Sequence, residues 1–365
     1  MPIPADITIV GGGIMGLLSA REFALAGAKV CVIDQSQPGR EASWAGGGIL
    51  LPLYPWRQDP AISQLVIPSL QLYPKLAEEL YENTGIDPEW DPCGLFISQN
   101  PDLDLANDWC NNYGVRYSEA APASVAELQG QWINPLFLPG IAQIRNPRLL
   151  KSLMQYLLNL GVEFIQNSRL LNLDITQQQI HSITTSTGKV TVDHLILTTG
   201  AWTGEIWSAL LPNRELTVDV QPVKGQMLLF DAKPGLLKHI VLDGDRYLIP
   251  RQDGGIVVGS TVEHCGFDKQ TTDQVRAELQ AFALQLLPAL KDYPVSHHWS
   301  GLRPGTAHGI PYIDNHPEIN NLSVCAGHFR NGLTMGPASA RLLADLICKR
   351  TCIVPPEPYQ LRAYH

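Results

Sequence analysis

The feature that most constrains this chain is a glycine-rich run near its start, Gly11-Gly12-Gly13-Ile14-Met15-Gly16. Residues 6–10 before it are mostly β-branched and predict a short, buried parallel strand. An apolar helix is expected over residues 14–26, and residues 29–33 predict a second strand that ends at Asp34. A strand, a glycine turn, a helix and a second strand ending in an acid make up a dinucleotide-binding βαβ unit.

Each glycine of the run has its own mechanical role in such a unit. Gly11 makes the tight turn, Gly13 lets the backbone approach a pyrophosphate, and Gly16 lets the helix pack closely on the strand. The helix N-terminus, at Ile14 and Met15, directs unpaired N–H groups and a partial positive charge toward that pyrophosphate.

The acid at the end of the second strand narrows the choice of cofactor. Asp34, which Gln35 follows, is placed to accept hydrogen bonds from an adenosine ribose. No arginine lies beside it, which argues against NADP and leaves NAD and FAD open. A glycine-rich turn that binds no ligand is the alternative interpretation of the same run.

A second glycine-rich stretch follows at residues 38–51. Three consecutive glycines do not suit a helix interior, but they let main chain lie against a flat or charged group. Apolar neighbours such as Trp44 argue against a surface linker, although the bulk of Trp44 leaves the fine positioning of this loop open. We expect the loop to face the cofactor through its small residues: Ala42, Ser43, Gly46, Gly47 and Gly48.

Composition and charge exclude several classes of function. The formal net charge is −9 and no Lys/Arg stripe is present, so we expect no nucleic-acid partner. No apolar run is long enough for a membrane span. The seven cysteines are scattered without a Cys-x-x-Cys pair, which favours reduced thiols in the cytoplasm and indicates no metal site.

The rest of the chain mixes helical and strand patterns. Apolar residues recur at helical spacing in five further segments: 62–83, 103–113, 146–160, 272–287 and 332–349. Strands are expected at 90–98, 162–165, 170–175, 180–185 and 194–200, and residues 219–260 alternate like an antiparallel sheet.

These patterns predict an α/β fold with two domains. A Rossmann-like, FAD- or NAD-binding domain, discontinuous in sequence, is expected from residues 1–50, 146–215 and 300–365. A substrate-binding domain with a mainly antiparallel sheet and helices is expected from residues 51–145 and 216–299. At 365 residues the chain is long enough for both.

Seven short blocks of sequence carry a resemblance to known enzymes: 9–16, 198–202, 222–226, 247–251, 258–261, 301–306 and 327–332. On these blocks, in order over nearly the whole chain, the sequence resembles the D-amino-acid-oxidase-type flavoenzymes. Within them it most resembles the glycine oxidases associated with thiamine thiazole synthesis. The last three blocks are the most specific, and they include Gly301-Leu-Arg-Pro-Gly-Thr306 and Gly327-His-Phe-Arg-Asn-Gly332.

The resemblance implies a non-covalently bound FAD. It adds main-chain contacts at Leu170 and Gly200 to those of the first βαβ unit. It also implies that backbone N–H groups of the C-terminal block lie near the electron-poor edge of the flavin. The residues implied there are His328, Phe329, Arg330, Asn331, Gly332, Leu333 and Thr334. This block has no cysteine where sarcosine-oxidase relatives attach flavin covalently.

The resemblance also implies a substrate site, in which Arg303 holds the carboxylate and Tyr247 and Arg330 lie beside it. A planar guanidinium suits bidentate contact with an α-carboxylate. Anchoring that end places the Cα–H over the flavin N5. No side chain is expected to act as an obligatory general base, because hydride transfer from a neutral amine needs none.

The implied activity is oxidative deamination of glycine and other small amino acids, such as sarcosine, D-alanine and D-proline. O2 is reduced to H2O2, and the imine hydrolyses to a keto acid (glyoxylate from glycine) plus ammonia or an amine. The resemblance further suggests a homotetramer. Two alternatives stay open: a D-amino-acid dehydrogenase that uses a quinone or carrier protein, and a non-catalytic FAD-binding protein or flavin module of a tRNA-modifying system.

Overall fold

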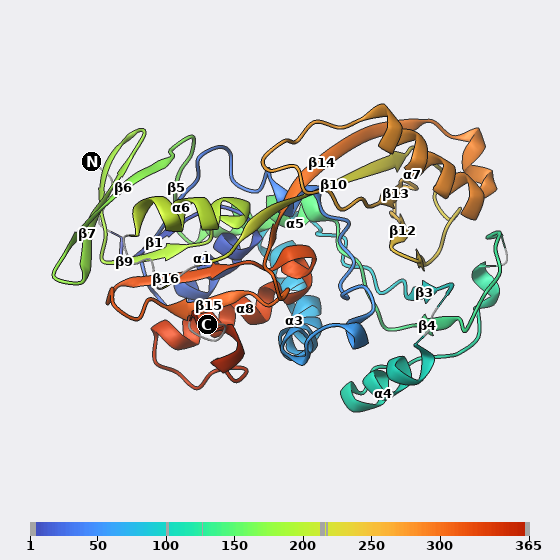
Figure 1. Cartoon of the computed structure of the whole chain (residues 1–365), viewed down its shortest axis with the longest axis horizontal. Coiled ribbons are helices and arrows are strands. Elements are labelled where there is room, and N and C mark those ends of the chain that lie inside the picture. Colours follow the sequence, from blue (N-terminus) through green and yellow to red (C-terminus); the bar gives the residue numbers. More distant parts are fainter. Residues whose placement is uncertain (1–4, 100–101, 126, 212–215, 217, 362–365) are drawn as a thin grey trace.

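The computed structural model describes residues 5–99, 102–125, 127–211, 216 and 218–361. Its strands form three sheets, of six, seven and three strands. In Figure 1 the elements of the six-stranded sheet lie at the left, and most of the seven-stranded sheet lies at the right. The long strands β10 (Gln221–Phe230) and β14 (Val295–Gly305) reach across between them.

The six-stranded sheet has the glycine-rich unit at its centre. Its order is β15 (Tyr312–Asn315), β16 (Leu322–Ala326), β9 (His194–Leu197), β1 (Ile7–Val10), β2 (Val30–Ile33) and β5 (Glu163–Ile165). All neighbours pair in parallel except β15 with β16. The central strands are fully buried, as parallel strands are when other elements cover both faces.

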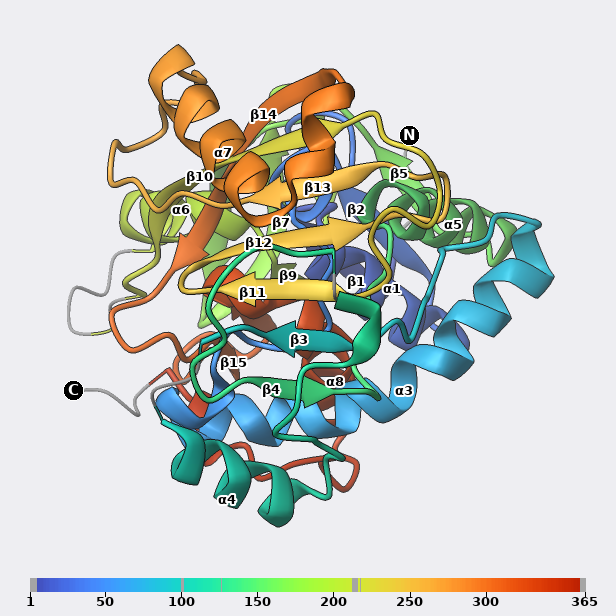
Figure 2. The same cartoon turned by 90° about the vertical axis from the view of Figure 1, so that its right-hand side faces the viewer.

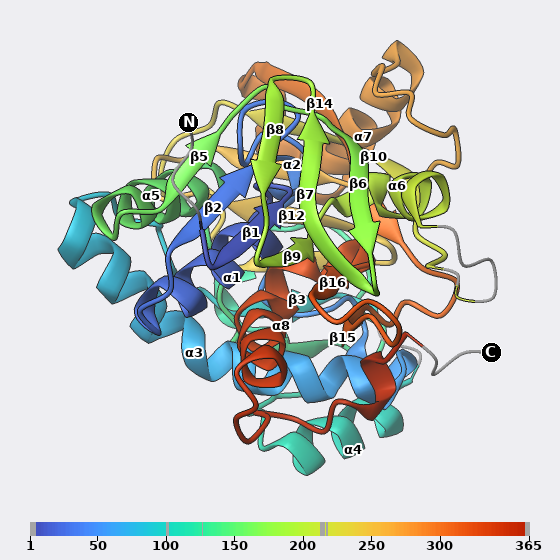
Figure 3. The same ribbon diagram turned by 90° about the vertical axis from the view of Figure 1, so that its left-hand side faces the viewer.

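Alternate residues of the central strands enter two different cores. Ile9 and Val32 pack with four helices: α1 (Ile14–Leu25), α3 (Pro60–Thr84), α5 (Asn146–Asn159) and α8 (Gly332–Ile347). Val10 and Ile33 face the opposite core, with α6 (Thr203–Leu210) and the antiparallel sheet of β6 (Leu170–Thr176), β7 (Gln179–Thr185) and β8 (Gly188–Thr191). Figure 3 shows this small sheet in front of the larger one.

The seven-stranded sheet contributes part of the wall of the central cavity, which is described in the next subsection. Its order is β14, β10, β13 (Ile256–Gly259), β12 (Arg246–Pro250), β11 (Ile240–Asp243), β3 (Leu95–Ile97) and β4 (Leu136–Leu138). Only β11 and β3 pair in parallel. Helix α7 (Asp273–Leu286) packs on its outer face, as Figure 2 shows.

The remaining elements are short, apart from α4 (Leu103–Tyr113). They are α2 (Ala42–Ala45) and the 3-10 turns η1 (Pro55–Arg57), η2 (Ala123–Val125), η3 (Gly200–Trp202), η4 (Pro288–Asp292), η5 (Phe329–Asn331) and η6 (Glu357–Tyr359). None of the helices in the described ranges combines the length and the apolar character that a membrane crossing requires.

The predicted α/β fold class is confirmed, and most predicted helices are present within two residues of their expected ends. The predicted strand at residues 90–98 was wrong in its extent, because residues 90–98 form a strand only at Leu95–Ile97. Several elements were not predicted: α6, β4, β8, β14, β15 and β16. The predicted domain boundary at 215 lies outside the described residues, and β14 runs across the boundary at 300. The two-domain division therefore stays a prediction.

Candidate active site

Two adjoining cavities lie at the carboxyl ends of β1, β2 and β9. Five residues line both of them: Gly13, Ala42, Ser43, Thr198 and Gly200. The nucleotide-side cavity, as we call the second, includes Gly11 and Asp34, where β1 and β2 end. The central cavity extends to Met227 of β10, Tyr247 of β12 and Arg303 of β14. Open α/β sheets bind their ligands at the carboxyl ends of parallel strands.

Steric crowding explains the glycines of the first turn. Gly11 has φ +109°, and a Cβ there would lie 2.3 Å from the carbonyl oxygen of Thr198. A Cβ on Gly16 would lie only 1.9 Å from the carbonyl oxygen of Gly11. Gly16 thus holds α1 against the strand and lines neither cavity, whereas Gly13, Ile14 and Met15 line the central one.

Asp34 lines the nucleotide-side cavity together with Gln35 and Leu170. Its Oδ2 accepts a hydrogen bond from the backbone N–H of Gly12 at 2.7 Å, and its Oδ1 accepts one from Ser36 N at 2.8 Å. The carboxylate therefore fixes the glycine turn, a role that its position in the sequence did not reveal. Ser36 Oγ also donates to Oδ1 at 3.2 Å. Because a carboxylate has about four acceptor sites, these three bonds leave capacity for a ribose hydroxyl.

Neighbouring side chains hold the 38–51 loop, whose glycines 46–48 all line the central cavity. Asn146 donates its Nδ2–H to the carbonyl oxygen of Ser43 at 2.7 Å, and Arg251 donates to that of Gly47 at 2.7 Å. Gly48 has φ +84°, and a Cβ there would lie 2.0 Å from the carbonyl oxygen of Ile144. The main chain of this loop therefore forms a fixed wall of the cavity.

Trp44, whose bulk left the loop position open, packs away from the cavities. Its ring lies edge-on to that of Trp299, with 6.1 Å between the ring centroids. The indole N–H of Trp299 donates to the carbonyl oxygen of Ala45 at 3.0 Å. The tryptophan pair thus braces α2 against β14.

The C-terminal block supplies a further wall. His328 is 1% exposed and lines the central cavity, and neither of its ring nitrogens has a hydrogen-bond partner among the described residues. Burial lowers the pKa of His328 to about 3, so the imidazole is neutral. Buried polar atoms are rarely unpaired, so these nitrogens indicate that a ligand completes the site.

The six predicted residues after His328 differ in whether they line the central cavity. Residues 329–333 line the central cavity, and Phe329 has φ +47°, a strained conformation that concentrates at functional sites. Thr334 lines neither cavity, because its hydroxyl turns to the carbonyl oxygen of Ile49 and donates to it at 3.1 Å.

The three predicted substrate residues, Tyr247, Arg303 and Arg330, come together around the central cavity. The Arg303 guanidinium donates to Ser260 Oγ at 2.8 Å and to the carbonyl oxygen of Thr261 at 3.0 Å. It has five N–H donors, so these bonds leave others for a ligand.

Electrostatics favour an anion in this cavity. Arg303 and Arg330 both line it, and no Asp or Glu does within the described ranges. Burial lowers the pKa of Arg303 to about 10, an effect that the nearby Tyr247 opposes and Arg330 reinforces. The guanidinium stays charged at neutral pH, and a bound carboxylate would relieve the repulsion between the two arginines.

Several lining residues were not predicted. They are mainly Thr198, Asn146, Gly225 and Met227 around the central cavity and Ser168 and Arg169 around the nucleotide-side cavity. Thr198 could have been found, because it directly follows a buried strand in a block already quoted. In the described part of the chain, no group of three or more His, Cys, Asp or Glu is arranged to hold a metal ion.

Comparison with known proteins decides the family. The model of the FAD-dependent oxidoreductase family matches residues 6–346. The chain belongs to this family. The predicted FAD cofactor and the predicted enzyme class, an FAD-dependent amino-acid oxidase, are thereby confirmed at the family level.

Individual relatives agree with this assignment. The chain is 42% identical to a glycine oxidase from Pseudomonas aeruginosa over 97% of each protein. It is 32% identical to a bifunctional protein ThiO/ThiG from Trichormus variabilis, over 94% of this chain and 53% of that protein. The crystal structure of glycine oxidase from Geobacillus kaustophilus superimposes with a TM-score of 0.91 at 25% identity, with both chains fully covered.

The residues present fit FAD. Glycine backbone lines both cavities, at Gly11 and Gly13 in the nucleotide-side cavity and at residues 46–48 in the central one. The unpaired imidazole nitrogens of His328 belong to the lining of the central cavity. Cys325 lines the same cavity, but it is buried, and burial raises the pKa of its thiol. The protonated thiol is a poor nucleophile, which favours the predicted non-covalent binding.

Proposed function

We propose that this chain oxidises glycine and other small amino acids, with O2 as the electron acceptor. The observation that carries the proposal is the meeting of Arg303, Tyr247 and Arg330 around one cavity walled by glycine-rich turns. The identity with the P. aeruginosa glycine oxidase supports glycine as a substrate. Sarcosine, D-alanine and D-proline are proposed as further substrates.

The nucleotide-side cavity would hold the adenosine-diphosphate part of FAD, with Gly11 and Gly13 at the pyrophosphate and Asp34 at the ribose. Leu170 would contact the adenine side through its main chain. The central cavity would hold the flavin, against the 42–48 loop, Gly200 and residues 328–333. Bound FAD supplies a two-electron acceptor that O2 can reoxidise with formation of H2O2.

The chain itself binds and orients the substrate. Arg303 would pair with the α-carboxylate through donors that Ser260 and Thr261 do not use. The hydroxyl of Tyr247, a residue that lines the cavity and is 7% exposed, would add a hydrogen bond. Arg330, from the C-terminal block at residues 327–332, would add a positive charge. This anchoring sets the direction of the Cα–H, and such positioning supplies much of the rate.

Among the described residues that line the central cavity, no side chain is suited to take up a proton at neutral pH. His328 is too weak a base, since burial lowers its pKa to about 3. The substrate therefore has to enter as the neutral amine, and we expect kcat/KM to rise with pH as that fraction increases. The imine product hydrolyses to glyoxylate and ammonia when glycine is the substrate.

The relatives suggest a setting for this activity. The similarity to a bifunctional ThiO/ThiG protein, over 53% of that protein, supports a role in thiamine thiazole synthesis. The homotetramer and the cytoplasmic location stay predictions from the sequence. The proposal includes only small amino acids and O2 as partners.

A substrate panel tests the proposal. The purified protein, saturated with FAD, is incubated in air with glycine, sarcosine, D-alanine, D-proline and L-alanine, and H2O2 and keto acid are measured. We expect equal amounts of both products from glycine. Reduction of the flavin by glycine without peroxide, with activity only when a quinone is added, would instead establish the dehydrogenase alternative.

A further inference from the structure

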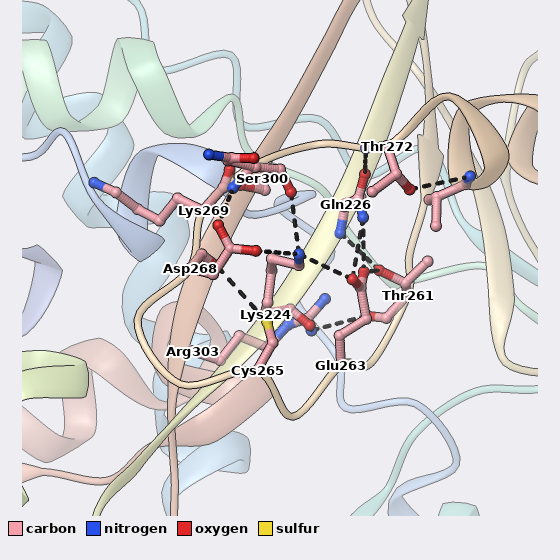
Figure 4. Close-up of polar contacts among 12 residues, drawn as sticks. Lys224, Gln226, Thr261, Glu263, Cys265, Asp268, Lys269, Thr272, Ser300 and Arg303 are labelled. Carbon is pink, nitrogen blue, oxygen red and sulfur yellow. Dashed lines mark hydrogen bonds and ion pairs between the residues drawn. The ribbon is translucent and has the colours of Figure 1, made fainter.

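A cluster of polar side chains lies next to Arg303 but does not line the central cavity (Figure 4). Its main members are Lys224, Gln226, Thr261, Glu263 and Asp268. It joins β10 to residues 260–272, which we call the strap segment and which contain no helix and no strand. From residue 264 onward this segment is exposed. It is held by contacts with β10, by Ser300 Oγ, which donates to the carbonyl oxygen of Lys269, and by stacking of Phe267 on Trp202.

Lys224 is the buried anchor of the cluster, at 3% exposure. Its Nζ lies 3.0 Å from Oε2 of Glu263 and 3.5 Å from Oδ2 of Asp268, and it donates to the carbonyl oxygen of Gln270 at 3.0 Å. A lysine has three N–H donors, and these three acceptors use all of them. The buried charge is thereby fully paired by the strap segment.

Glu263 lies at the centre of the cluster. Besides the lysine contact, it accepts hydrogen bonds from Gln226 Nε2 at 2.9 Å and from the hydroxyl of Thr261. Burial alone would raise the pKa of Glu263, but the hydrogen bonds from Thr261, Gln226 and Lys224 outweigh it and lower the pKa. The carboxylate is therefore ionised and ties Thr261 to β10.

The same cluster supplies the acceptors that orient the Arg303 guanidinium. Arg303 donates to the carbonyl oxygens of Thr261 at 3.0 Å and Lys224 at 3.4 Å, the two residues that flank the Glu263 carboxylate. The backbones of Lys224 and Glu263 exchange two hydrogen bonds of 2.9 Å each. A shift of Glu263 would therefore move both carbonyls and turn the guanidinium that faces the cavity.

We propose that Glu263 and Lys224 are positioning residues for Arg303 and set the affinity of the central cavity for the substrate carboxylate. Neither side chain lines the cavity. The inference rests on the proposed function, because it assigns the carboxylate to Arg303. It adds that the strength of this contact is set by the ion pair between the buried Lys224 of β10 and the half-buried Glu263 of the strap segment.

The variant Glu263→Gln tests the inference, since it removes the charge but keeps the size of the side chain. We expect KM for glycine to rise about tenfold, the equivalent of ~1.4 kcal/mol, while kcat at saturating glycine and the FAD content stay within about twofold. Lys269→Met is the matched control, because Lys269 lies in the same segment but its side chain forms only an exposed ion pair with Glu41. The hydrogen bond from Ser300 Oγ to the Lys269 carbonyl oxygen is kept in this variant. Its KM should be unchanged.

Two further measurements separate positioning from a general loss of structure. Acetate, which carries the carboxylate without the amine, is titrated into each FAD-loaded protein while the flavin spectrum is recorded. Its Kd should rise with KM. Lys224→Met is then added to Glu263→Gln. Because the two residues position Arg303 as one pair, which Glu263→Gln has already broken, the second change should weaken acetate binding little further.

A changed melting temperature of Glu263→Gln with unchanged KM and unchanged acetate Kd would overturn the inference, since the cluster would then be only structural. A loss of kcat or of FAD with KM unchanged would overturn it as well. If the wild-type protein binds acetate but does not oxidise glycine, the proposed function fails. The positioning inference then stands or falls on the acetate Kd of Glu263→Gln.

Discussion

Gly225 allows the role of Arg303 to be tested without altering the arginine itself. A Cβ at position 225 would lie 2.2 Å from Nη2 and 2.4 Å from Cζ of Arg303. One of the two groups has to move. The backbone of Gly225 pairs with Gly301 of β14 and is held in the sheet, whereas the guanidinium is the end of a flexible side chain. We therefore expect Gly225→Ala to displace the guanidinium from its place in the cavity.

The size of the effect follows from the contact that is lost. A hydrogen bond to a charged group contributes about 1.5–3 kcal/mol. Loss of that contribution weakens binding by a factor of about 10–150. Folding should survive, since replacing glycine by alanine in a strand is itself favourable by roughly 0.5–1 kcal/mol.

Steady-state kinetics of the FAD-loaded variant check this expectation. KM for glycine should rise by about 10–150-fold, on the estimate above, with the flavin spectrum unchanged. Gly255→Ala serves as the control, because its nearest side-chain neighbour is Leu229 Cδ1 at 3.1 Å and it lines neither cavity. An unchanged KM in a folded Gly225→Ala protein would refute Arg303 as the carboxylate anchor.

Three further predictions address the arginine, the cofactor and the buried histidine. Arg303→Met should raise KM for glycine by about 100-fold or more, whereas Arg276→Met, on the exposed side of α7, should not. Gly16→Ala should be purified without FAD, because its Cβ would lie 1.9 Å from the Gly11 carbonyl oxygen, whereas Gly140→Ala, with open space around it, should be yellow. His328 has a pKa of about 3 when folded, against about 6.5 for a free imidazole, so the unfolded chain binds the proton first as pH falls. Its contribution to the free energy of unfolding is full above pH 6.5 and falls by up to ~1.4 kcal/mol per pH unit toward pH 3. Denaturant unfolding of the apoprotein should show this slope, and His328→Gln should reduce it by about this amount. A similar slope should remain in both proteins, because burial also lowers the pKa of His194, to about 4.

The parts of the fold that local sequence determines were predictable. The βαβ unit was found because its strands, turn and helix are adjacent in the chain and each carries its own pattern. Helix α3 was predicted although Pro68 and Pro74 lie inside it, since apolar spacing and the closing Gly85 outweigh two prolines.

The long strand β14 was missed for a reason that lies outside the strand. Gly301, Pro304 and Gly305 all lower its strand propensity. It is a strand because residues 295–305 pair with β10 across a long sequence separation, and Pro304 is tolerated because β14 is an edge strand. Arg303 therefore points from a rigid strand and not from a loop.

The candidate site was predictable as a set of residues but not as a set of contacts. All three substrate residues line one cavity, and of the cofactor residues only Gly16 and Thr334 lie outside both linings. The burial of His328 could not be predicted, and neither could the hydrogen bonds by which Glu263 fixes the residues that accept from Arg303. Both depend on segments far apart in sequence.

Anaerobic titration of the purified protein with glycine tests the central claim most directly. We expect the visible absorbance bands of a bound flavin, their bleaching by glycine, and their return with one equivalent of H2O2 when air is admitted. Flavin bands that glycine does not bleach at any concentration would contradict the assignment of Arg303, Tyr247 and Arg330 to a glycine site.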